Sequence, residues 1–205
     1  MVLEFPDRIV YGSDFPIIMS FERRYVQVEV MDAIRARSSL RRYKEDPVSW
    51  DLVLHVLEAA RLAPSWHNKQ GWFFLVLTDE RRKLLAECLY EANPAKNALM
   101  QAPVNIVLCA DPAQSGSYNG KEYYMVDAAC AMENLMLAAV DKGLGTCWVA
   151  GGLNDDLIKK TFNIPENIKV VAVTPLGYPS YQPKPRPRKS IQEIAFLNGW
   201  GNEIS

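Results

Sequence analysis

Cationic and hydroxyl side chains are concentrated in one short segment early in the chain. Residues 35–43 read RARSSLRRY and contain four arginines and two serines. Phosphate groups are held in proteins by bidentate guanidinium groups, hydroxyl groups and backbone N–H groups, and this segment offers all three. It is therefore a candidate anion site. Because exposed arginines are common, a solvated basic helix end is the competing interpretation.

A second basic cluster lies near the other end of the chain. Prolines are interspersed among its members, which are Lys184, Arg186, Arg188 and Lys189. Proline keeps the backbone extended, so alternate side chains point the same way. The two basic clusters could converge on one phosphate, or they could be two separate solvated surfaces.

A polar loop at residues 63–72, APSWHNKQGW, connects a predicted helix to a predicted strand. Loops between rigid elements often carry binding residues. A turn in which Asn and Ser satisfy their own backbone is an equally good interpretation. His67 could act as a base, but the sequence identifies no carboxylate partner for it.

The glycine-rich stretch at residues 143–153, GLGTCWVAGGL, is similar to a dinucleotide-binding fingerprint but does not meet its requirements. Its glycines lie before and after a predicted strand, whereas the fingerprint places them in a strand-to-helix turn. Gly151 and Gly152 would still let backbone N–H groups approach a planar ligand, because glycine has no Cβ. A tight turn explains them equally well.

The elements that must position these stretches alternate between helix and strand, which predicts one domain of mixed α and β structure. Val30 and Ile34 favour a short helix before the arginine-rich segment, and Ser49 is a plausible N-cap for a helix that Pro64 ends. Apolar runs predict buried strands at 72–78, 102–110, 145–150 and 168–177. Further helices are expected at 79–90 and 154–163.

The longest predicted helix covers about 121–142 and is apolar nearly all round, so it should be buried in the core or in a subunit interface. Asp127 and Glu133 lie six positions apart on it. They therefore do not share one face as an acid–base pair would.

Composition excludes several classes of protein. The chain has 205 residues and a formal net charge of −1, so one core is expected and general nucleic-acid binding is not. No apolar run reaches the ~18 residues of a membrane span, and the N-terminus does not resemble a secretory signal. The four cysteines are expected to be buried thiols in a cytoplasmic protein, and no metal-ligand spacing appears.

Together, RSSLRRY, the 63–77 stretch, the 123–152 stretch and the closing LGYPSYQPKPRPRKSIQEI resemble the FMN-dependent nitroreductase family. The resemblance covers roughly residues 31–195. It implies an α+β fold with a mostly antiparallel central sheet flanked by helices, and an intertwined homodimer with two FMN molecules at the interface. Residues 1–30 have no counterpart in this pattern and are expected to form an ordered arm before a single domain at 31–205.

The resemblance also assigns residues to the cofactor. The N-terminal motif matches Arg37, Ser38, Ser39 and Arg41, with Arg37 and Ser39 on the phosphate and ribityl chain and Arg41 near the pyrimidine edge. Pro64, Ser65, Trp66 and Asn68 match a loop that contacts the flavin held mainly by the other chain. Asn93 matches an asparagine at the pyrimidine edge, and Ala150 and Gly151 match backbone donors to the ring. Arg186 and Arg188 match phosphate ligands. The family's usual Gln-Pro-Trp reads Gln70-Gly71-Trp72 here.

The function that the resemblance implies is NADH- or NADPH-driven reduction of a nitroaromatic, a quinone or a related small acceptor, with ping-pong kinetics. No side-chain nucleophile is expected, since the cofactor carries the chemistry. Alternatives are a flavin-binding or flavin-carrier protein without nicotinamide turnover, a family member with a specialised reaction such as dehalogenation or flavin fragmentation, and a structural dimer with an empty site.

Overall fold

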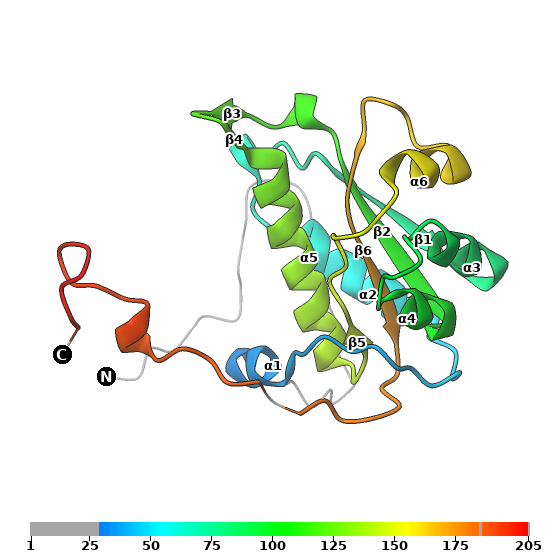
Figure 1. The fold of residues 1–205 in the computed structure, drawn as a ribbon, viewed down its shortest axis with the longest axis horizontal. Coiled ribbons are helices and arrows are strands. Elements are labelled where there is room, and N and C mark those ends of the chain that lie inside the picture. Colours follow the sequence, from blue (N-terminus) through cyan, green and yellow to red (C-terminus); the bar gives the residue numbers. More distant parts are fainter. Residues whose placement is uncertain (1–28, 185, 205) are drawn as a thin grey trace, which may run out of the picture.

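A four-stranded antiparallel sheet forms the centre of the computed structural model, which describes residues 29–184 and 186–204 (Figure 1). The strand order is β1-β2-β6-β5, with β1 at Trp72–Leu77, β2 at Val104–Ala110, β6 at Lys169–Gly177 and β5 at Gly145–Thr146. Every residue of β2 is buried, which explains why its sequence is a continuous apolar run.

Helices cover both faces of this sheet. Their bounds are α1 Val30–Ala36, α2 Trp50–Arg61, α3 Asp79–Glu87, α4 Lys96–Gln101, α5 Tyr123–Asp141 and α6 Asp155–Phe162. Side chains alternate along β2, so Ile106 and Leu108 pack with α2 and α5, whereas Val107 and Cys109 pack with α3, α4 and α6. The α+β class and the antiparallel sheet that the resemblance implied are confirmed.

Several element boundaries differ from those predicted. The third predicted strand stops at Thr146, because the N–H of Cys147 bonds to the side-chain oxygen of Thr174 (3.2 Å) and leaves the ladder. The chain pairs with β6 again at Val149. The helix expected at 79–90 ends at Glu87. Helix α4 and the hairpin of β3 (Ser117–Tyr118) and β4 (Lys121–Glu122) were not predicted, because both are short.

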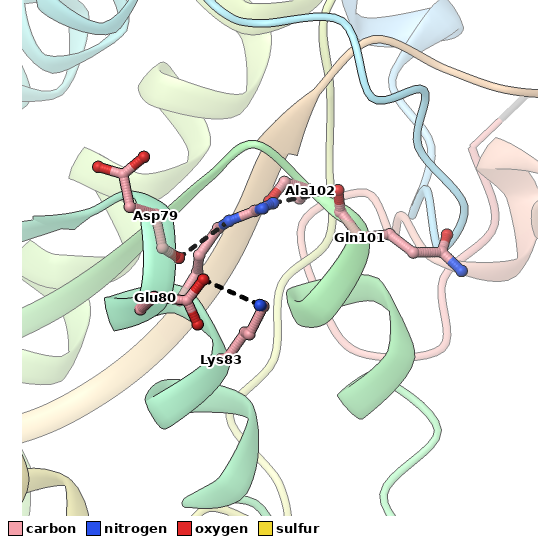
Figure 2. A network of polar contacts seen from close by, with 6 residues as sticks. Asp79, Glu80, Lys83, Gln101 and Ala102 are labelled. Atoms are coloured by element: carbon pink, nitrogen blue, oxygen red, sulfur yellow. Dashed lines mark hydrogen bonds and ion pairs between the residues drawn. The ribbon is translucent and has the colours of Figure 1, made fainter.

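Arg82 joins the start of α3 to the end of α4. Its guanidinium donates to the carbonyl of Ala102 (2.6 Å), and its Nε donates to the carbonyl of Asp79 (3.1 Å). Figure 2 shows these partners beside the neighbouring Lys83–Glu80 ion pair. The end of helix α4 is thereby fixed to the start of helix α3.

The C-terminal tail begins against the body and then leaves it (Figure 1). Residues 178–181 pair with 42–44 through the Tyr43–Pro179 bridge and the bond from the Lys44 N–H to the Tyr178 carbonyl (2.9 Å). The short helix Ile191–Glu193 follows, capped by Ser190. Within the described residues no helix has the length and hydropathy to cross a membrane. The arm predicted for residues 1–30 lies, up to residue 28, outside the described residues.

Candidate functional site

A cavity of about 410 Å³ lies where three distant parts of the chain meet. One wall is Arg41, a second is the connection 90–95 before α4, and a third is the segment 147–152 after β5. Four of the predicted cofactor residues, Arg41, Asn93, Ala150 and Gly151, therefore line one cavity. The structure brings together residues that the sequence only assigned to separate motifs.

Asn93 fixes the geometry between two of these walls. Its Nδ2 donates to the carbonyls of Gly151 (2.8 Å) and Gly152 (3.2 Å), and its Oδ1 accepts from the N–H of Ala95 (2.9 Å). Gly152 has φ +70, and a Cβ there would lie 2.8 Å from Asn93 Nδ2. Glycine is required at 152 both for its backbone conformation and for the close approach of Asn93.

The arginine-rich segment reaches the cavity because it runs alongside β5. Ser39 forms a parallel bridge with Thr146, and the N–H of Leu40 donates to the Thr146 carbonyl (2.8 Å). The absence of a side chain at Gly145 makes room for Leu40, since a Cβ there would lie 2.3 Å from Leu40 Cδ2. In this extended segment Arg41 faces the cavity, and its Nη1 lies 3.4 Å from the Ser39 carbonyl.

Cys147 is a buried thiol beneath this segment. Burial raises the pKa of the Cys147 thiol. The positive charges of Arg41 and Arg37 and a hydrogen bond with the Ser39 side chain lower this pKa by a smaller amount. Three predicted cofactor residues are thus close enough to influence one sulfur atom. Arg37 itself is the C-cap of α1, with its Nε 3.8 Å from a carboxylate oxygen of Glu133 on α5. Ser38 is half-buried.

The loop after α2 lies at the start of α5 and lines no part of this cavity. Pro64 and Asn68 are exposed, whereas Ser65 and Trp66 are half-buried. The Trp66 ring stacks on Tyr123, with ring centroids 4.5 Å apart and planes at 23°. The expectation that this loop borders a flavin held by a second chain remains a prediction.

Arg186 and Arg188 are both exposed on the tail. The start of that tail lies beside residues 42–44, at the end of the arginine-rich segment. The segments that carry the two basic clusters therefore lie side by side at residues 42–44 and 178–180. Their convergence on one phosphate remains a prediction.

The cavity also has lining residues that the sequence did not indicate. Tyr90, Cys147 and Trp148 line the cavity but were not predicted. Trp148 lies inside the quoted glycine-rich stretch, so its position in that motif was the available signal.

A larger hollow of about 990 Å³, on the Arg42 side of the extended segment, contains none of the predicted cofactor residues. The smaller cavity is the better candidate, because four residues predicted to contact a cofactor line it and none lines the larger hollow.

Comparison with known proteins gives consistent results. The family model described as "Nitroreductase family" matches residues 34–178. A protein of Archaeoglobus fulgidus, provisionally named an NADH dehydrogenase/NAD(P)H nitroreductase, is 36% identical over 154 residues, which cover 74% of this chain and 86% of that protein. A provisionally named Methanothermobacter thermautotrophicus protein with the same description is 30% identical, covering 83% and 87%.

Solved structures are also similar. A nitroreductase family protein from Clostridium novyi NT superposes with a TM-score of 0.72 at 36% identity, covering 86% of this chain and 97% of that one. An FMN-dependent nitroreductase from Clostridium difficile R20291 gives a TM-score of 0.72 at 25% identity, covering 82% and 99%. More distant relatives are named 5,6-dimethylbenzimidazole synthase (27% identical, Rhodospirillum rubrum) and iodotyrosine deiodinase (26%, Thermotoga neapolitana).

Proposed function

Because the chain belongs to the Nitroreductase family, we propose that it is an FMN-dependent oxidoreductase that uses NADH or NADPH to reduce a small acceptor such as a nitroaromatic or a quinone. The observation that carries this proposal is the convergence of Arg41, Asn93 and the 150–151 backbone on one cavity. The names of the archaeal relatives support nicotinamide use, and the Clostridium difficile structure supports FMN.

The residues present fit a flavin. A flat ring needs a wall without protruding side chains, and a Cβ at Gly151 would meet nothing within 4 Å, so the backbone there faces open space. The pyrimidine edge of the ring needs a cation and hydrogen-bonding groups. Arg41 would supply the cation, and Asn93, whose Nδ2 already donates to Gly151 and Gly152, would offer the second lone pair of Oδ1. The cavity of about 410 Å³ lies within the size range of small-molecule pockets.

When bound, FMN would supply a ring that takes up a hydride and passes electrons on. The contribution of this chain is binding, orientation and charge. Arg41 would stabilise negative charge at the pyrimidine edge, and the N–H groups of Ala150 and Gly151 would orient the ring from its other side. Arg37, Ser38, Ser39, Arg186 and Arg188 would hold the ribityl phosphate. Because one face serves both the donor and the acceptor, we expect ping-pong kinetics.

We further propose a homodimer in which Pro64, Ser65, Trp66 and Asn68 of each chain border the flavin of the other. Two observations support it. The loop lies outside the cavity of its own chain. Large apolar side chains are also exposed on α1, α5 and the tail, including Met31 (53%), Val126 (53%) and Trp200 (93%).

The test is direct. Purified protein should bind FMN at about one per chain, and NADH or NADPH should bleach its absorption under anaerobic conditions. Protein that does not bind added FMN would overturn the proposal. Protein that binds FMN but is not reduced would favour a flavin carrier.

A specialised reaction is the second candidate, since relatives carry the names of a deiodinase and a 5,6-dimethylbenzimidazole synthase. An anaerobic screen of FMN-loaded protein against nitroaromatics, quinones and iodinated tyrosine would separate these activities.

A further inference from the structure

The loop after α2 has an unusual backbone. His67, Asn68 and Gln70 have φ values of 47, 56 and 52, in the left-handed region that non-glycine residues rarely adopt. Such a conformation persists only where the surroundings hold it. The residues that hold it therefore determine where the loop lies.

Asp127 on α5 is the group that holds this loop. Its side chain is buried, and the two carboxylate oxygens have different partners. Oδ1 accepts from the backbone N–H of Trp66 (2.9 Å), and Oδ2 accepts from the hydroxyl of Ser115 (2.9 Å). Hydrogen bonds to a charged acceptor are stronger than neutral ones, and a buried carboxylate that loses them is costly.

Packing adds to this hold. The Trp66 ring stacks on Tyr123 in the first turn of α5. The ring also lies against Gly116, where a Cβ would be 2.5 Å from Trp66 Cε2. The bond from the Gln70 N–H to Ser65 Oγ (2.9 Å) then closes the loop on itself. Trp66 is thus fixed at its backbone by Asp127 and at its ring by Tyr123 and Gly116.

We propose that Asp127 is a positioning residue: its carboxylate locks residues 65–70 in the strained conformation that presents the exposed edge of the loop to the flavin of the second chain. The functional consequence rests on the proposed function, whereas the locking itself does not. Loss of the carboxylate should release the loop without dismantling the sheet, since the loop is attached to α5 mainly through Trp66.

The test compares Asp127→Ala with Ser115→Ala. The serine variant removes one partner of the carboxylate but keeps the bond to the loop. Amide hydrogen exchange is measured on flavin-free protein. We expect the amides of residues 66–70 to exchange about tenfold faster or more in Asp127→Ala and near the wild-type rate in Ser115→Ala. Asp127→Asn, which keeps one acceptor oxygen, should lie between them.

FMN affinity and steady-state kinetics give the functional readout. The Asp127→Ala dimer should bind FMN about tenfold more weakly, or show a raised acceptor KM with kcat less affected, and Asp127→Asn should restore much of the loss. If Asp127→Ala does not fold, Asp127→Asn is compared with Ser115→Ala in the same two measurements.

The outcomes are distinct. Unchanged exchange at 66–70 in both Asp127 variants overturns the locking. Faster exchange with unchanged FMN affinity and unchanged KM overturns the positioning role, while the flavoenzyme proposal stands. Wild-type protein that binds no FMN removes the proposed function, and the exchange data still decide whether Asp127 locks the loop.

Discussion

Single residues set the shape of the proposed flavin cavity. Asn93 joins the segment 90–95 to the backbone after β5 by donating to the carbonyls of Gly151 and Gly152. It can approach so closely only because residue 152 has no side chain. The two adjacent glycines are therefore not equivalent. Gly151 borders open space beside the cavity, whereas Gly152 is in close contact with Asn93 and has a left-handed backbone conformation.

This difference predicts that the same substitution is destabilising at one glycine and neutral at the other. Gly152→Ala should lower the free energy of unfolding by about 1–2 kcal/mol, because alanine is strained at φ +70 and its Cβ meets Asn93. Gly151→Ala should cause no loss, since its Cβ meets nothing within 4 Å. Urea denaturation of the flavin-free proteins measures both. Equal stability of the two variants would contradict the assigned role of Asn93.

Thiol reactivity can also be predicted for individual residues. Burial raises the pKa of Cys109 from 9.0 to about 11 and raises that of Cys147 as well, so at pH 8 both thiols carry less thiolate than in the unfolded chain. Iodoacetamide at pH 8 should therefore modify the half-buried Cys130 first, and the buried Cys109 and Cys147 only after unfolding. Mass spectrometry of the alkylated protein checks the order; early modification of Cys109 in folded protein would contradict it.

At the scale of elements, short helices position the site and need anchors of their own. Helix α4 has six residues, too few to be stable alone, and the connection that carries Asn93 leads into it. Arg82 holds the far end of α4 through the carbonyl of Ala102 (Figure 2).

Arg82→Ala should therefore destabilise the protein by about 1–2 kcal/mol, because the carbonyl of the buried Ala102 loses a charged donor. Lys83→Ala is the matched control in the same network. Its partner Glu80 is 81% exposed, so the loss should be below about 0.5 kcal/mol. Thermal or urea denaturation of both variants distinguishes them, and a Lys83→Ala loss as large as that of Arg82→Ala would rule out the anchoring role.

For the whole molecule, the important feature is apolar surface that a single chain leaves uncovered. The tail extends beyond the body on the side away from α3 and α4 (Figure 1). It exposes Ile191 (61%), Ile194 (58%) and Trp200 (93%). Exposure of this extent favours burial against a second copy, as the proposed homodimer requires.

Trp200→Ala should weaken the dimer at least tenfold, since buried tryptophans are frequent hot spots of about 2 kcal/mol or more. Met100→Ala, at an exposed apolar position on α4, should leave the dimer unchanged. Sedimentation velocity over a concentration series measures both. A wild-type protein that is monomeric at all concentrations would overturn the proposed dimer together with the role of the partner's loop.

Much of the fold was predictable because its signals are local. Buried strands read as apolar runs, α5 reads as an apolar helix, and the cofactor motifs have recognisable residue types at short spacing. The shift at Cys147 was not predictable, because it depends on a hydrogen bond to Thr174 in another strand. Short elements such as α4 carry too few residues for a periodic signal.

The sequence by itself determined the class of the fold, the order of the motifs and the residue types available to a flavin, since these depend on neighbours along the chain. Only the tertiary structure decided that Asn93 meets Gly151, 58 residues away, and that Asp127 holds Trp66, 61 residues away. On the sequence Asp127 had no partner and no role. Its role arises because α5 packs beside the loop and because a buried carboxylate must find hydrogen-bond donors wherever the fold brings them.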